Sequence, residues 1–305
     1  MRRHLLTVLL HMVSVALGVS ILSFTFMHLS GDPVMLMLPP DATQKQIEEF
    51  RERMGFNDPI PLQYVRFLSG AVRGDFGTSL RHQQPAMGLV LERLPATLEL
   101  AVAGMGIALL VAVPFGIFSA LRRGSALDYC VMGGALLGLS MPNFWVGIIG
   151  ILLFAVKLHL LPTSGRGTWV QLVLPGIALG SYLMALIARL TRSGMLEVIS
   201  QDYVRTARAK GLGEPAIVLR HALMNALIPL VTVVGLQMGE LLGGTVVIET
   251  VFAWPGVGRL ILQAVFQRDY PLVQAAVFIL AMIFVAANLF VDITYRYLDP
   301  RIRHG

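Results

Sequence analysis

Long stretches without a charged side chain alternate with polar segments along the chain. Six stretches lack Asp, Glu, Lys and Arg over roughly 20 residues, the length that a helix needs to cross a bilayer. They span residues 4–31, 100–121, 129–156, 167–188, 221–239 and 270–291. Lipid admits only helices or closed barrels, and barrel strands alternate in polarity. The pattern therefore predicts an all-α membrane protein with six transmembrane helices.

The composition supports this fold class. Hydrophobic residues make up 55% of the 305 residues and charged residues only 14%, with a mean hydropathy of +0.71. Soluble domains carry about 25% charged residues. The net charge of +6 fits basic cytoplasmic loops. No basic run is interleaved with aromatic residues, so we expect no binding of nucleic acid.

Basic residues in the short loops predict the orientation. With a cytoplasmic N-terminus, the two short outer loops hold only Lys157, Arg166, Arg259 and Arg268, and the inner segments hold most of the other arginines. Both termini are therefore expected in the cytoplasm. We expect residues 1–30 to form the first transmembrane helix, 31–95 an extracytoplasmic segment, 96–297 the core transmembrane domain, and 298–305 a cytoplasmic tail.

The predicted extracytoplasmic segment contains an amphipathic helix. Ile47, Phe50 and Met54 share one helical face between Thr43 and Met54, and Gly55 follows as a stop signal.

The chain lacks the residues that hydrolyse ATP. It contains no G-x-x-x-x-G-K-[ST] phosphate loop, no H-E-x-x-H and no G-x-S-x-G. The lone Cys130 forms no internal disulfide, and no Cys/His cluster has metal-ligand spacing. We expect no metal, no cofactor and no catalytic site; if transport is active, a partner must use the ATP.

The segment with the most distinctive composition is the predicted cytoplasmic loop at residues 192–225. Residues 202–210 favour a helix, Gly211 and Gly213 break it, and Pro215 suits the first turn of a second helix. Two short helices joined at a glycine bend would form a rigid knob that docks in a groove of another protein. An ordinary basic inner loop is the alternative.

The run from Asp202 to Pro229 resembles the cytoplasmic "EAA" loop of ABC importer permeases of the peptide/nickel class. Arg205-Thr206-Ala207 occupies the position of Glu-Ala-Ala, and Gly211 that of the motif glycine. Leu223-Met224 stands where the general motif has Leu-Pro, a departure expected of this class.

The resemblance extends along nearly the whole chain. Five further motifs occur in order: GDP at residues 31–33, RGDFGTSL at 73–80, LPATLEL at 94–100, LPTSG at 161–165 and ETVFAWPGVG at 249–258.

The resemblance implies a type I ABC importer permease fold in a bacterial inner membrane. It also implies a second, homologous permease subunit, two cytoplasmic ATPase subunits that bind the ATP, and an extracytoplasmic substrate-binding protein. Dipeptides, oligopeptides, glutathione-like peptides and nickel complexes all remain open as substrates.

The expected ATPase-coupling residues all lie in the 192–225 loop. They are Asp202, Arg205, Thr206, Ala207, Gly211, Glu214, Arg220, His221 and Asn225. Arg205, Arg208 and Arg220 are candidates to pair with acidic groups on the ATPase, and the small Ala207 and Gly211 would permit its close approach.

Glu240 interrupts the fifth apolar stretch, which continues through residues 241–248. A charge at mid-bilayer costs about 2.5–3.5 kcal/mol, so Glu240 should face the helix bundle or a water path. A place on the translocation path and a structural polar contact both remain open.

Two other classes of function are alternatives. An intramembrane hydrolase would need paired catalytic groups at depth, and no such pair stands out. An ion-coupled carrier or a passive channel would lack an ATPase partner.

We expect a cysteine placed at Thr43 to react with a membrane-impermeant thiol reagent added outside the cell, because residues 31–95 follow the first span on its outer side. Labelling of intact cells and of inside-out vesicles checks this. Reaction from the cytoplasmic side alone would refute the orientation.

Overall fold

The computed structural model describes residues 2–29, 34, 38 and 42–298. Within these residues the regular structure is helical, and the only β-bridge is the isolated one between Thr78 and Pro85. The prediction of an all-α protein is confirmed.

The chain divides into two compact units. Unit 1 comprises Met1–Ala96 and Gly256–Ala286, and unit 2 comprises Thr97–Pro255 and Ala287–Gly305. The predicted division at residues 30, 95 and 297 separates segments by their side of the membrane rather than by compactness, and it stays a prediction.

Four helices in the described part of the chain are long and apolar enough to cross a bilayer. They are α1 (Arg2–Leu29), α5 (Ala86–Leu121), α8 (Trp169–Ile199) and α13 (Tyr270–Leu298). The predicted fifth stretch lies almost wholly in α11 (Leu223–Val251), which remains helical through Glu240.

The predicted third stretch is bent rather than straight. It forms α6 (Ala126–Ser140), α7 (Asn143–Gly150) and the π-helix η1 (Ile151–Lys157). The two halves meet at 110°. Met141, before Pro142, has an extended ψ of 130°. A residue before proline is disfavoured in the α conformation, so the expectation of one continuous helix is wrong at this point. The pair is still apolar and long enough to be a broken span.

In addition to α1, the described residues of unit 1 form the shorter helices α3 (Gln44–Met54), α4 (Ile60–Val72) and α12 (Val257–Phe266). The predicted amphipathic helix is α3. A capping box between Thr43 and Gln46 begins it, and Gly55 ends it in the left-handed conformation, with φ of 71°.

A buried carboxylate fixes the loop before α5 to the start of α13. Asp269 is fully buried. It accepts hydrogen bonds from the Ser79 hydroxyl at 2.5 Å and from the backbone N–H groups of Leu80 and Arg81 at 3.2 and 3.3 Å. The surrounding core of unit 1 includes Phe76, which contacts Phe278 with ring centroids 5.3 Å apart.

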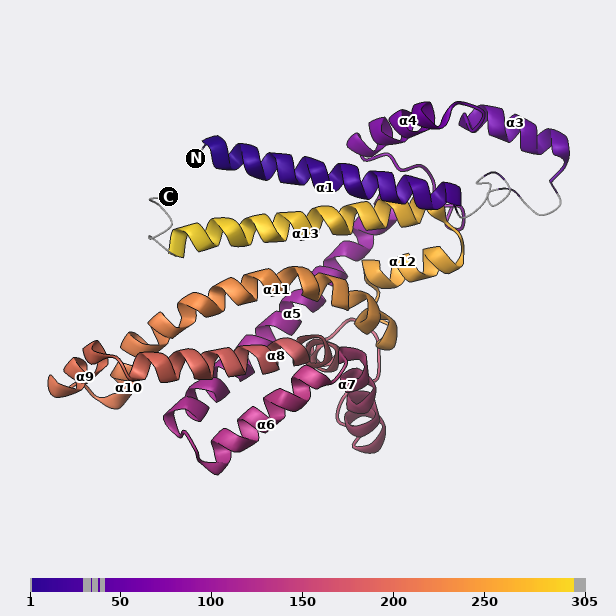
Figure 1. The fold of residues 1–305 in the computed structure, drawn as a ribbon. Helices are drawn as coiled ribbons and strands as arrows, with labels where there is room; N and C mark the ends of the chain where they lie inside the picture. The colour runs from indigo at the N-terminus through magenta and orange to yellow at the C-terminus, as the bar shows by residue number, and fades with distance from the viewer. Residues whose placement is uncertain (1, 30–33, 35–37, 39–41, 299–305) are drawn as a thin grey trace. The chain divides into compact units, whose positions relative to one another are not determined.

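Helix α8 is the central element of unit 2 and packs along α6, α7 and α11 (Figure 1). It also crosses α5 very closely: a Cβ added at Gly180 would lie 2.5 Å from the carbonyl oxygen of Gly104. Small residues at such crossings let helix backbones approach each other in lipid, where apolar burial alone gives little association. The buried side chains of α8 include Leu179, Leu183 and Ile187.

We expect Asp269→Ala to destabilise the protein by at least about 2 kcal/mol, because several buried donors would lose their acceptor and each such loss costs roughly 1–3 kcal/mol. Thermal unfolding of the purified protein in detergent measures this. Asp75→Ala is the control: the exposed Asp75 side chain accepts from one backbone N–H, that of Gly77 at 2.9 Å. Equal losses for both variants would contradict the anchoring role of Asp269.

Candidate functional site

A short helical loop joins the ends of α8 and α11 in unit 2 (Figure 1). It consists of α9 (Asp202–Ala209), α10 (Glu214–Ala216) and the π-helix η2 (Ile217–Ala222). We refer to residues 200–222 as the α8–α11 loop. The predicted first helix and the predicted place of Pro215 in the next helical turn are confirmed. The second helix is not separate as predicted, because η2 continues directly into α11.

The bend after α9 depends on Gly211. Its φ is +80°, a conformation that glycine adopts without the steric cost that other residues incur. A Cβ at this position would meet nothing within 4 Å. A side chain here would therefore strain the backbone and cause no clash within the described chain.

The inner face of the α8–α11 loop is a small apolar core. Val204, Ala207 and Ile217 are buried, with exposed fractions of 0%, 8% and 0%, and Val198 of α8 packs against them. Ala207 thus permits close packing inside the loop. This differs from the expectation that its small side chain faces a partner.

The outer face of the loop and its junction with α11 expose apolar side chains. Tyr203 is 43% exposed, Leu219 58% and Met224 63%. Arg205 and Arg220 are also exposed. The accessible surface therefore combines apolar groups with positive charge.

Arg208 is engaged within the chain, unlike the expectation that it meets an acidic partner. Its Nε donates to Oε1 of Glu214 at 2.7 Å, and its Nη2 donates to Oε2 at 3.3 Å. These hydrogen bonds hold the pKa of Glu214 below its ordinary value. Both side chains are well exposed, so the pair orients the bend and adds little stability.

Asn225 links the first turn of α11 to α9. Its amide donates to the Tyr203 hydroxyl at 3.1 Å and to the carbonyl oxygen of His221 at 2.7 Å.

The structure places most of the predicted coupling residues on the surface. Exposed are Asp202, Arg205, Thr206, Gly211, Glu214, Arg220 and Asn225, while His221 is half-buried and Ala207 buried. Val204 and Ile217, which hold the loop together, were not predicted as site residues. The i, i+3 spacing of Val204 and Ala207 on α9 is the local signal that indicates a buried face.

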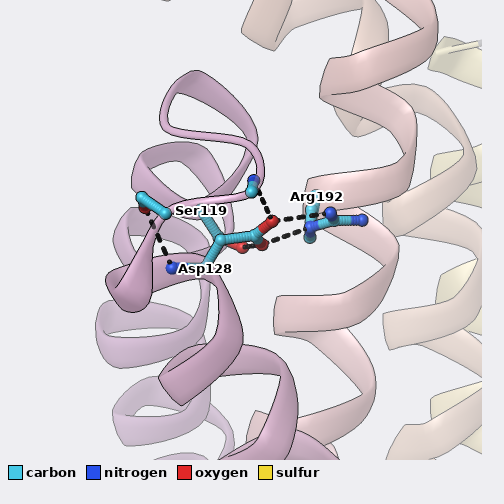
Figure 2. Close-up of polar contacts among 5 residues, drawn as sticks. Ser119, Asp128 and Arg192 are labelled. Atoms are coloured by element: carbon cyan, nitrogen blue, oxygen red, sulfur yellow. Dashed lines mark hydrogen bonds and ion pairs between the residues drawn. The ribbon is translucent and has the colours of Figure 1, made fainter.

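A charged cluster lies two helical turns before the end of α8. Figure 2 shows Asp128, at the start of α6, facing Arg192 of α8. Nε and Nη2 of Arg192 donate to Oδ1 and Oδ2 of Asp128 at 2.6 and 2.9 Å. This bidentate geometry strengthens the ion pair. The Ser119 hydroxyl and the Gly124 N–H also donate to Asp128. Asp128 is only 3% exposed.

Apolar packing surrounds this end of unit 2. Ile117 of α5, Met195 of α8, Val218 and Ala222 of η2, and Ala226 of α11 form one buried cluster. The α8–α11 loop is thus attached to three long helices at its base. The sequence analysis did not predict the Asp128–Arg192 pair. The two residues are 64 positions apart in the sequence, and Arg192 resembles any other basic residue of a cytoplasmic loop.

Glu240 lines a cavity of about 320 Å³ in unit 2. The lining residues are Met141, Pro142, Asn143, Leu179, Tyr182, Leu183, Gln237, Glu240, Leu241 and Gly244. The Gln237 amide donates to Oε2 of Glu240 at 2.9 Å. Among the described residues, no group of three His, Cys, Asp or Glu side chains could hold a metal ion.

Two family models match the chain. Residues 112–304 match "Binding-protein-dependent transport system inner membrane component", and residues 1–101 match the N-terminal part of a binding-protein-dependent transport system membrane component.

Relatives of similar length match nearly end to end. The chain is 43% identical to the dipeptide transport system permease protein DppB of Alkalihalophilus pseudofirmus, with 97% of this chain and 98% of that protein covered. It is 42% identical to the oligopeptide transport system permease protein AppB of Bacillus subtilis, covering 96% of each. It is 41% identical to the glutathione transport system permease protein GsiC of Escherichia coli, covering 97% of each.

A solved structure shares the fold. The inward-facing MetNI methionine ABC transporter contains a chain with a TM-score of 0.57 at 18% identity, covering 70% of this chain and 97% of that chain. At this identity the likeness shows the fold alone.

We expect Asp128→Asn and Arg192→Gln each to lower the melting temperature by several degrees, because each leaves a charged group without its partner. The double variant should lose less than the sum of the two single losses. Thermal unfolding in detergent gives all four values of this double-mutant cycle.

The matched control is the same cycle on the exposed pair of Arg166 and Glu99, whose Nε and Oε2 lie 2.7 Å apart with side chains 37% and 40% exposed. That cycle should show little coupling. Additive losses at Asp128 and Arg192 would contradict a stabilising ion pair between these two residues.

Proposed function

Because the chain belongs to the family of binding-protein-dependent transport system inner membrane components, we propose that this multi-pass ABC permease subunit carries short peptides or a related small solute across a bacterial plasma membrane. Its relatives are named for dipeptides, oligopeptides and glutathione. These names support a peptide substrate and leave a nickel complex as the less favoured case. Nothing in the comparisons supports an ion-coupled carrier or a passive channel.

The fold is that of a type I ABC importer permease, as the sequence resemblance implied. Members of this family depend on an ATPase and on a substrate-binding protein. In our proposal the complete transporter holds two cytoplasmic ATPase subunits, a second homologous permease subunit and an extracytoplasmic binding protein. The ATP is bound by the partners, since this chain has no phosphate loop.

The observation that carries the proposal is the α8–α11 loop. It has its own buried core of Val204, Ala207 and Ile217, and it exposes Tyr203 and Leu219 next to Met224 at the start of α11. A preformed helical projection of this kind suits a groove on an ATPase subunit. Exposed ion pairs contribute only about 0–1 kcal/mol each, so these apolar side chains must provide much of the docking energy.

In the proposed mechanism, closure of the ATPase dimer around ATP displaces the loop. Because the loop is continuous with α11 and packed against α8, it would move these helices with it. The helices would then rock between inward- and outward-facing states around a central path. Glu240, in the cavity between α8 and α11, lies on that path in our proposal.

We expect Gly211→Val to abolish most substrate uptake while membrane abundance stays normal. The β-branched residue is strongly disfavoured at the φ of +80°, so the loop would be misplaced on the ATPase. The spans that insert the chain lie elsewhere. Uptake and ATPase co-purification are measured on the complete transporter.

Gly213→Val is the matched control. Gly213 has a φ of −66° and a ψ of 146°, which any residue adopts, and a Cβ there would meet only Pro215 Cδ, at 3.9 Å. This variant should retain most uptake. Wild-type uptake in Gly211→Val would show that the loop is not the coupling element.

A further inference from the structure

The carboxylate of Glu240 lies deep within the mostly apolar helix α11, whose other carboxylate, Glu249, is near the end of the helix and fully buried. Glu240 is 11 residues from Val251, the nearer end of α11, which corresponds to about three helical turns. A charged group at this depth is costly in lipid and is tolerated where it faces water or protein. The side chain is exposed and lines the 320 Å³ cavity. The cavity is therefore its aqueous surrounding.

A second feature of the same cavity is compatible with water. The break between α6 and α7 contributes Met141, Pro142 and Asn143 to the lining. Met141 has an extended backbone, so the helical hydrogen-bond ladder is interrupted here. Non-helical backbone at membrane depth occurs where it is buried in protein or lines a water-filled cavity. The broken span and the carboxylate thus share one aqueous site.

The charge of the cavity has one sign. Glu240 is the only acidic residue among its described lining residues, and no Lys, Arg or His is among them. Gln237 donates to Oε2 of Glu240, and among the described residues no hydrogen-bond donor to Oε1 is found. The Tyr182 hydroxyl adds a further oxygen that can accept a hydrogen bond, whereas Oδ1 of Asn143 already accepts from the Ser181 hydroxyl at 3.2 Å. Such a cavity attracts a cation that can donate several hydrogen bonds.

We propose that this cavity is a station on the substrate path that binds the terminal ammonium group of a peptide through Glu240. The proposal rests on the transport function proposed above and adds its substrate chemistry. An ammonium group offers three donors and a full positive charge. The volume suits the terminal residue of a short peptide, being at the small end of the usual range for ligand pockets.

The four residues that α11 contributes to the cavity share one face of that helix. Gln237, Glu240, Leu241 and Gly244 follow the i, i+3, i+4, i+7 spacing. A cysteine at Gly244 would therefore lie one turn from Glu240. Its Cβ would meet Leu179 Cδ1 at 3.4 Å, an ordinary contact. This position can report the local charge without removing the carboxylate.

The test measures thiol reactivity in the complete transporter. Cys130, the one native cysteine and an exposed one, is first changed to alanine. Gly244→Cys is then treated with a trimethylammonium and with a sulfonate methanethiosulfonate. We expect the cationic reagent to react faster, and Glu240→Gln to lower the cation-to-anion rate ratio about tenfold. A unit charge about 6 Å away in water changes each rate roughly threefold, in opposite directions.

Glu99→Gln is the matched control, because Glu99 is also an exposed carboxylate of unit 2 and does not line this cavity. It should leave the rate ratio unchanged. No reaction with either reagent would overturn the aqueous site. If Glu240→Gln left the cation-to-anion rate ratio unchanged, Glu240 would not be the source of negative charge in the cavity.

Uptake of radiolabelled dialanine into proteoliposomes tests the ammonium group itself. We expect Glu240→Gln to lower uptake about tenfold and Glu240→Asp, which keeps the charge, to retain most of it. Full uptake in Glu240→Gln would overturn the proposal that Glu240 binds the ammonium group of the peptide. If the wild type takes up no peptide while the cation preference of Gly244→Cys persists, the proposed peptide transport fails and the cation site remains.

Discussion

Inside a bilayer every peptide N–H and C=O must find its partner within the protein, and the described structure follows from that constraint. It explains why α5 and α8 run unbroken for 36 and 31 residues. It also accounts for one place where the backbone is not helical: the extended Met141 borders the cavity that Glu240 lines.

Lipid also removes the usual reason for helices to associate, because lipid tails are as apolar as leucine. Unit 2 relies instead on close backbone contact and on polar pairs. Gly180 brings α8 against the carbonyl oxygen of Gly104, and Arg192 binds Asp128 through two hydrogen bonds. Each contact needs residues that are far apart in sequence. Together they make α8 the helix on which the rest of unit 2 packs.

Local pattern was sufficient for much of the fold and for part of the site. Long apolar runs predicted the helices, the apolar face between Thr43 and Met54 with its stop at Gly55 predicted α3, and Gly211 predicted the bend after α9. The 110° bend at Pro142 was not predicted, because the apolar run continues through it. The partners of Arg192 and Arg208 were not predicted either, since hydropathy says nothing about which charges meet. The burial of Ala207 depends on Ile217, whose position follows from the tertiary fold.

The loop and the cavity adjoin the same two helices, and in the proposed function these helices connect the ATPase to the substrate. Leu183 of α8 lines the cavity, and Ile199 ends the helix at the loop; the 16 steps from one to the other correspond to a rise of about 24 Å. On the other side, η2 leads into α11, which carries Glu240. The loop is packed against α5, α8 and α11 through Val218 and Ala222, and it has its own apolar core, so it is not free to shift alone. In the proposed function, an ATPase that displaces the loop would therefore move both walls of the Glu240 cavity, as alternating access requires.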